Sequence, residues 1–168
     1  MDHAIALSTE KPDRAVRAIV VAGLICGTLD INGAFVTAWY NAGILPDQLL
    51  KIVAGGLLGP AARDGGWGIA ALGLGMHFCV AFTVTVIFYA LSRRIRFLTT
   101  QAVASGLLYG AGVYLTMNFV VLPLLAQFRS LYIPETKPFV PHLALGQFGV
   151  HLTCVGLAIS LSVRRWSR

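Results

Sequence analysis

Four polar side chains stand out because each lies within a long run of apolar residues. They are Asp30, His77, Asn118 and His151, with one in each of four such runs. An amide or ionisable group surrounded by apolar residues is costly, so its presence there indicates a structural or functional role. These four residues form the candidate polar site of the chain.

Two kinds of chemistry suit the ionisable members of this set. A histidine and a desolvated aspartate can exchange a proton in the physiological range, as a proton or solute pathway requires. Two imidazoles and one carboxylate, supplied by His77, His151 and Asp30, also match a common set of metal ligands.

A haem is a further alternative, with His77 and His151 as axial ligands from two helices. The glycines that would leave room for a porphyrin are Gly73, Gly75 and Gly149. Neither a metal nor a haem has a specific spacing signature here, so the cofactor stays open. The same polar groups would also serve as structural links, since polar bonds between membrane helices contribute only about 0.6 to 2 kcal/mol each.

Enzymatic and nucleic-acid functions lack sequence support. The chain has no GxSxG, HExxH or P-loop pattern, and the glycine-rich segment 55–66 lacks the Gly-Lys-Ser/Thr ending that binds phosphate. The net charge of +6 comes from short basic clusters beside apolar runs, without a recognition helix or a stacking-aromatic pattern. We therefore expect a non-enzymatic protein with no nucleic-acid partner.

Composition places the polar residues in membrane-spanning helices. The 168 residues are 57% hydrophobic and only 12% charged, whereas a soluble domain carries roughly 25% charged residues. Each apolar run exceeds the roughly 20 residues that a helix needs to cross a bilayer. The predicted spans of this single membrane domain, which covers residues 1–168, are 18–40, 67–91, 101–126 and 142–163.

The four polar residues fall at similar depths in these spans. At a rise of about 1.5 Å per residue, they lie roughly 2 to 7 Å from the span midpoints, all on the same side. We call this level the polar slab. Other polar residues near the slab are Thr28, Asn32, Tyr114, Thr116 and Gln147.

The basic residues predict the orientation. Nine Lys and Arg residues lie in the two termini and the middle loop, against four in the other two loops. Because cytoplasmic loops carry the excess of Lys and Arg, we expect both termini and Arg93, Arg94 and Arg96 in the cytoplasm.

The two outward connections differ in character. Segment 46–58 begins with proline and is apolar enough to predict a short interfacial helix, which Gly59-Pro60 would end. A re-entrant segment that lines a pore is the alternative. Segment 128–141 carries three prolines and predicts an irregular connection.

The two halves of the chain resemble each other. Gly23 and Gly27 match Gly106 and Gly110, and a Gly-x-His element recurs at His77 and His151. This pattern predicts two related helical hairpins arranged as a parallel repeat. Glycines four residues apart allow helices to approach closely, so they should bring spans one and three together or join the chain to a partner.

Several of these motifs carry a family resemblance. Segments 57–66, 71–78, 106–110 and 117–124 resemble those of uncharacterised bacterial four-span inner-membrane proteins of the YagU type and related domains of unknown function. The resemblance covers residues 18–163 and implies a location in the bacterial cytoplasmic membrane. It carries over no catalytic residues.

These observations predict an all-α, integral membrane four-helix bundle. Its leading predicted role is that of an accessory or self-associating subunit of a membrane complex, with the lipid bilayer and a second copy or another membrane protein as partners. The first alternative is a small channel or carrier of protons, ions or solutes that uses the polar slab. The second is a haem- or metal-binding electron-transfer protein.

Overall fold

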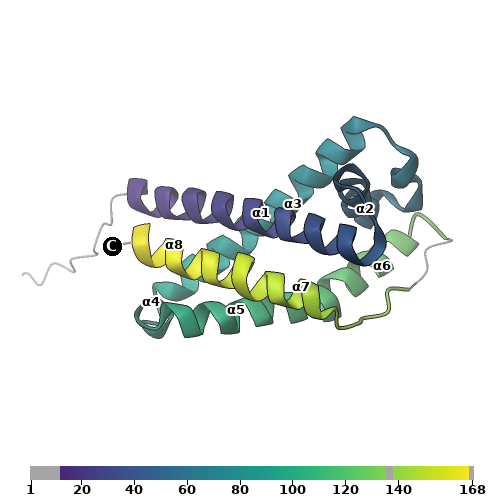
Figure 1. The fold of residues 1–168 in the computed structure, drawn as a ribbon. Helices are drawn as coiled ribbons and strands as arrows, with labels where there is room; N and C mark the ends of the chain where they lie inside the picture. The colour runs from purple at the N-terminus through teal and green to yellow at the C-terminus, as the bar shows by residue number, and fades with distance from the viewer. Residues whose placement is uncertain (1–11, 135–137, 167–168) are drawn as a thin grey trace, which may run out of the picture.

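The computed structural model describes residues 12–134 and 138–166. Lys11, Lys137 and Arg168, which contribute to the predicted orientation, lie outside these residues. The described chain contains helices and no strands (Figure 1). In chain order the elements are α1 (Pro12–Ala42), α2 (Pro46–Leu58), the 3-10 turn η1 (Pro60–Asp64), α3 (Trp67–Ser92), α4 (Phe97–Thr100), α5 (Ala102–Thr116), the π-helical segment η2 (Met117–Val121), α6 (Leu122–Ser130), α7 (Leu145–Val150), the π-helical segment η3 (His151–Leu157) and α8 (Ala158–Trp166).

These elements form four helices that are long and apolar enough to cross a membrane. They cover Arg14–Ala42, Trp67–Ser92, Ala102–Ser130 and Leu145–Trp166, and we call them spans one to four. Their outer surfaces carry large apolar side chains, such as Val36 and Leu108, which are 66% and 67% exposed. The predicted all-α four-helix bundle is therefore confirmed, and the chain is a multi-pass membrane protein.

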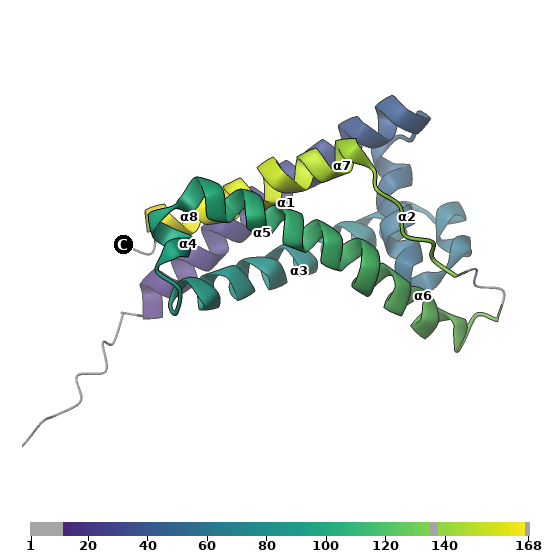
Figure 2. The ribbon, with the colours of Figure 1, turned by 90° about the horizontal axis from the view of Figure 1, so that it is seen from below.

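The spans pack tightly at one end of the bundle and separate at the other. Span one lies against α3 and α8, and α5 lies against η3 and α8. Towards the end that holds α2, the helices fan apart in both views of the ribbon (Figures 1 and 2). We call the two ends the α4 end and the α2 end.

The α4 end is sealed by a buried core. Phe88 and Ile159 are fully buried, and the ring of Tyr109 packs edge-on against Phe88 at 4.9 Å between centroids. The hydroxyl of Tyr109 donates to the carbonyl of Val84 at 2.6 Å and links α5 to α3. At the start of the bundle, the guanidinium of Arg17 lies 4.4 Å from the centre of the Trp166 ring.

Helix α2 packs across the opposite end. As predicted, it begins at Pro46 and ends before Gly59, whose φ of 83° suits glycine. Ala54 is fully buried, and the carbonyl of Leu50 lies so close to Gly73 of α3 that any side chain at position 73 would collide with it. Glycine at position 73 therefore lets α2 dock against α3.

Residues at the end of span three hold the C-terminus of α2. The last carbonyls of a helix have no partner within the helix. Arg129 donates to the carbonyls of Gly55 and Gly56 at 2.9 and 3.3 Å, and Tyr132 donates to that of Leu57. A cation at this position also interacts favourably with the helix dipole.

The paired glycines act within hairpins, so the prediction that they join spans one and three is wrong. Gly23 and Gly27 receive the rings of Phe82 and Phe78 from span two. Gly106 and Gly110 instead approach the backbone of span four, where Gly156 faces them. Gly156 has no glycine four residues away in its own span, so the search for regular glycine spacing missed it.

The two hairpins share one further feature. The carbonyl of Gly27 contacts the ring of His77 at 2.9 Å, and Gly110 packs against the carbonyl of His151. In each hairpin, the second glycine of the first span thus lies beside the histidine of the second span. This correspondence supports a duplication, which stays a prediction, and the π-helical segments η2 and η3 occur only in the second hairpin among the described residues.

We expect Gly110→Ala to lower the free energy of unfolding by about 1–3 kcal/mol, because a Cβ there would meet the backbone of span four, which cannot rotate away. Gly112→Ala is the matched control, since a Cβ at Gly112 meets nothing within 4 Å. Unfolding of the purified protein in mixed detergent micelles measures both. Equal stability of the two variants would contradict the close contact between spans three and four.

Candidate functional site

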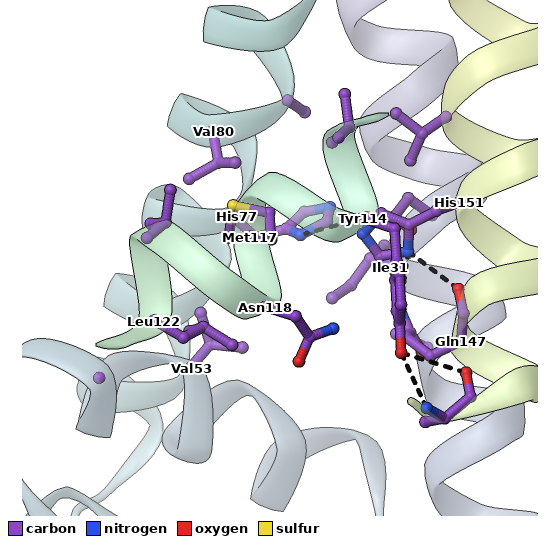
Figure 3. A pocket seen from close by; sticks show the side chains of 18 of the residues that line it. Ile31, Val53, His77, Val80, Tyr114, Met117, Asn118, Leu122, Gln147 and His151 are labelled. Carbon is purple, nitrogen blue, oxygen red and sulfur yellow. Dashed lines mark hydrogen bonds and ion pairs between the residues drawn. The ribbon is translucent and has the colours of Figure 1, made fainter. Parts of the chain in front are cut away.

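A cavity of about 570 Å³ lies at the α2 end of the bundle. Its volume falls within the range of small-molecule sites, roughly 300 to 1,000 Å³. Every predicted member of the polar site lines it: Asp30 from α1, His77 from α3, Asn118 from η2 and His151 from η3. Figure 3 shows His77, Asn118 and His151 around the cavity. The structure thus brings residues from all four spans to one place, while their role stays a prediction.

Asp30 and His77 form the centre of this site. The Nε2 atom of His77 lies 2.9 Å from the carbonyl oxygen of Gly27, so this nitrogen carries the proton and donates. The Nδ1 atom then faces the Oδ2 atom of Asp30 at 4.0 Å. The other carboxylate oxygen, Oδ1, is buried and has no hydrogen-bond partner among the described residues.

His151 also forms a hydrogen bond with a main-chain carbonyl, but within its own helix. Its Nδ1 atom lies 3.0 Å from the carbonyl oxygen of Gln147, one helical turn earlier. The Gln147 amide nitrogen is farther away, at 3.5 Å. Because the carbonyl can only accept, Nδ1 of His151 donates and Nε2 is left with a free lone pair in the neutral ring. Each histidine therefore uses one N–H on the main chain and keeps one acceptor.

Gln147 and Thr37 connect two walls of the cavity. The hydroxyl of Thr37 lies 3.1 Å from Oε1 of Gln147 and so joins α1 to α7. The same hydroxyl lies 3.0 Å from the carbonyl of Gly33, within its own helix. These contacts fix the position of the first turn of α7 beside span one.

Tyr114 positions the part of the cavity wall that α7 and η3 form. It is 1% exposed, and its hydroxyl accepts a hydrogen bond from the backbone nitrogen of Ala144 at 2.8 Å. Its ring packs edge-on against His151 and Phe148, with centroids 5.3 and 5.2 Å apart. Tyr114 therefore sets both the start of α7 and the orientation of the His151 ring.

The structure separates the other polar residues near the slab into two groups. Tyr114 and Gln147 line the cavity, whereas Thr28, Asn32 and Thr116 are exposed on the outside of the bundle. The depth of these residues in the membrane could not separate the two groups, because depth does not determine which face of the helix carries a residue.

Sequence reasoning missed three polar lining residues: Thr37, Asn41 and His142. The first two follow Asp30 at intervals of seven and eleven residues, which places all three on one helical face. That spacing could have identified Thr37 and Asn41. His142 lies in the connection before α7 and offered no periodic signal.

The predicted metal centre is not assembled. Among the described residues, no group of three or more His, Cys, Asp or Glu side chains is arranged to hold a metal ion. His77 and His151 each commit one ring nitrogen to a backbone carbonyl, and the remaining nitrogen of His77 faces Asp30 at 4.0 Å. The candidate ligands His77, His151 and Asp30 therefore share a cavity without forming a metal site.

The three glycines that were expected to leave room for a porphyrin do not line the cavity. Gly73 is covered by the backbone of α2. Gly75 and Gly149 have open space beside them, yet neither lines the cavity. These three glycines therefore do not form the space between His77 and His151.

The rest of the cavity wall is apolar. Ile31, Val53, Val80 and Leu122 line it, and no Lys or Arg does.

The chain matches no family model, and comparisons with curated proteins and with solved structures find no similar protein. The resemblance to YagU-type proteins stays a prediction.

Proposed function

We propose that this protein is a small, non-enzymatic membrane carrier that binds one largely apolar solute in the cavity at its α2 end. The observation that supports the proposal is that Asp30, His77, Asn118 and His151, one from each span, line a single cavity. Polar side chains that only hold helices together would not need to line one shared cavity that is large enough for a ligand. Ligand sites combine apolar walls with a few polar groups in this way.

The packing of the two ends suits such a role. The core around Phe88 and Ile159 closes the cavity on the α4 side, so one end of the bundle is sealed while the other holds the solute. Helix α2 covers the opposite side and contributes Ile52 and Val53 to the wall. A carrier needs a site that is closed towards one side of the membrane at a time.

The π-helical segments lie where a carrier would have to adjust. Segment η2 contains Asn118, and η3 begins at His151. Such segments disturb the regular hydrogen bonding of a helix and are frequent at functional sites. Two walls of the cavity, which Asn118 and His151 line, are therefore built from such segments.

We expect Ala34→Phe to abolish solute binding, because Ala34 lines the cavity and a phenyl ring would occupy much of its volume. Ala71→Phe is the matched control, since Ala71 is exposed and does not line the cavity. Binding of 2-phenylethanol to the protein in lipid nanodiscs, by titration calorimetry, is the measurement. Binding that survives Ala34→Phe would contradict the proposal.

We also propose that the protein lies in a bacterial inner membrane with both termini and Arg93–Arg96 in the cytoplasm. The nine-to-four distribution of Lys and Arg supports this orientation. It places α2 and the cavity on the outer side.

For this orientation, we expect Phe97→Cys to resist a membrane-impermeant thiol reagent added to intact cells, and Asp64→Cys to react. The background replaces Cys26, Cys79 and Cys154, of which Cys79 is exposed on the bundle surface. Reaction at position 97 with protection at position 64 would show the opposite orientation.

Self-association is a second candidate role, favoured by an amide on the outer surface. Asn32 is exposed, and its Nδ2 atom donates to the carbonyl of Thr28 at 2.7 Å. Its amide oxygen would face acyl chains in a monomer, at a cost that a second copy or a partner subunit would offset.

We expect Asn32→Leu to reduce dimer formation in nanodiscs or liposomes by about threefold or more, as the loss of one interhelical bond of roughly 0.6 kcal/mol or more implies. Single-molecule photobleaching of the labelled protein counts subunits. Thr116→Leu is the control, because it also replaces an exposed polar side chain with leucine, but on span three. A wild-type chain that is monomeric at every density would exclude the role.

A further inference from the structure

We infer that the solute is a protonated organic amine with an apolar body, and that Asp30 is its counter-charge. The inference rests on the proposed carrier function and names the class of its substrate. It follows from the hydrogen-bonding character of Asp30, His77 and His151, each of which keeps a free acceptor.

One oxygen of the Asp30 carboxylate is free to accept a hydrogen bond. Oδ1 of Asp30 is buried without a hydrogen-bond partner among the described residues, although a buried acceptor of this kind normally has one. Oδ2 faces Nδ1 of His77 at 4.0 Å, which is too long for a hydrogen bond. Oδ1 of Asp30 therefore lacks a donor, and a neutral His77 donates no hydrogen bond to Oδ2.

The histidines cannot supply that donor in their neutral form. His77 gives its N–H to Gly27 and His151 gives its N–H to Gln147, so the second nitrogen of each ring is an acceptor. Nδ1 of His77 lies 4.0 Å from Oδ2 of Asp30, and His151 lines the same cavity. The centre of the cavity thus presents a carboxylate and two lone pairs, an arrangement that calls for a group with several donors.

Charge favours the same class of ligand. No Lys or Arg lines the cavity, so the described wall holds no permanent cation to balance Asp30. An ammonium group brings one positive charge and up to three N–H donors, which matches the acceptors present. An anionic solute would meet a carboxylate and two lone pairs, and a neutral alcohol would supply one donor and no charge.

The apolar walls determine the remainder of the molecule. Val80, Val113 and Leu122 surround the polar centre, and the ring of Tyr114 lies beside it. A cavity of about 570 Å³ holds a phenylalkyl amine with room to spare.

A proton is the competitor of the amine at this site. A proton on the Asp30 carboxyl would remove the negative charge that an ammonium needs, so an ammonium has to displace that proton in order to bind. Binding should therefore weaken as the pH falls. The titratable groups that line the cavity with Asp30 are His77 from α3, His151 from η3, Tyr114 from α5, His142 from the connection before α7 and Cys26 from α1 itself.

The test compares three probes of similar size by titration calorimetry, with the full chain in phosphatidylcholine nanodiscs and empty nanodiscs as the blank. The probes are 2-phenylethylammonium, 2-phenylethanol and 3-phenylpropanoate. We expect the ammonium to bind about 10- to 100-fold more tightly than the alcohol, as a charge-assisted hydrogen bond implies. The carboxylate probe should show no binding.

Variants of Asp30 test whether its carboxylate causes the preference for ammonium over the alcohol. Asp30→Asn keeps the shape and should lower ammonium affinity to that of the alcohol, while Asp64→Asn, the same change at an exposed position, should have no effect. Asp30→Glu keeps the charge and should retain a preference for ammonium, which gives a result even if Asp30→Asn does not fold.

The outcomes separate the two proposals. Equal binding of ammonium and alcohol, or a preference for the anion, would overturn the amine class and leave the carrier function standing. Preference for ammonium that survives Asp30→Asn would remove Asp30 as its counter-charge. Failure of all three probes to bind the wild-type chain would overturn both proposals for ligands of this size.

Discussion

A carboxylate in the middle of a membrane-spanning helix has to be kept from the acyl chains, and much of this structure follows from how Asp30 is sheltered. Even insertion scales assign a charged residue at that depth a cost of about 2.5 kcal/mol or more. Span one is therefore turned so that Asp30 faces the other spans, with His77 4.0 Å away and His151 in the same cavity. The polar groups of three further spans face the same interior, which gathers them around one cavity.

The cavity exists because the two ends of the bundle are packed by different means. At the α4 end, side chains such as Phe88 fill the space between spans. Near the middle, Gly106, Gly110 and Gly156 bring the backbones of spans three and four together. At the α2 end the spans diverge (Figure 2). Helix α2 lines the cavity there with Leu49, Ile52 and Val53. Dispersion and close packing stabilise one half, while the other half retains an open volume of ligand size.

Main-chain carbonyls determine the chemistry of the cavity as much as the side chains do. Gly27 and Gln147 each take the N–H of a histidine ring, and this fixes which nitrogen of His77 and His151 remains free. Tyr114 holds the ring of His151 from the side and the start of α7 through Ala144. The acceptor character of the site is thus built into the backbone, which explains why a set of residues that includes typical metal ligands does not form a metal centre.

The sequence by itself determined the spans, the short helix from Pro46 and the four polar residues, because all of these depend on local composition and on the cost of polar groups in lipid. It could not determine which spans touch. The glycines at 23 and 27 looked equivalent to those at 106 and 110, yet the first pair receives aromatic rings and the second pair receives backbone. Only the tertiary structure decided that Asn32 faces outward while Thr37 faces the cavity, and that both histidines bond to carbonyls. The physical reason is that depth in the membrane follows from position along the chain, whereas rotation about the helix axis and pairing between helices depend on contacts between residues far apart in sequence.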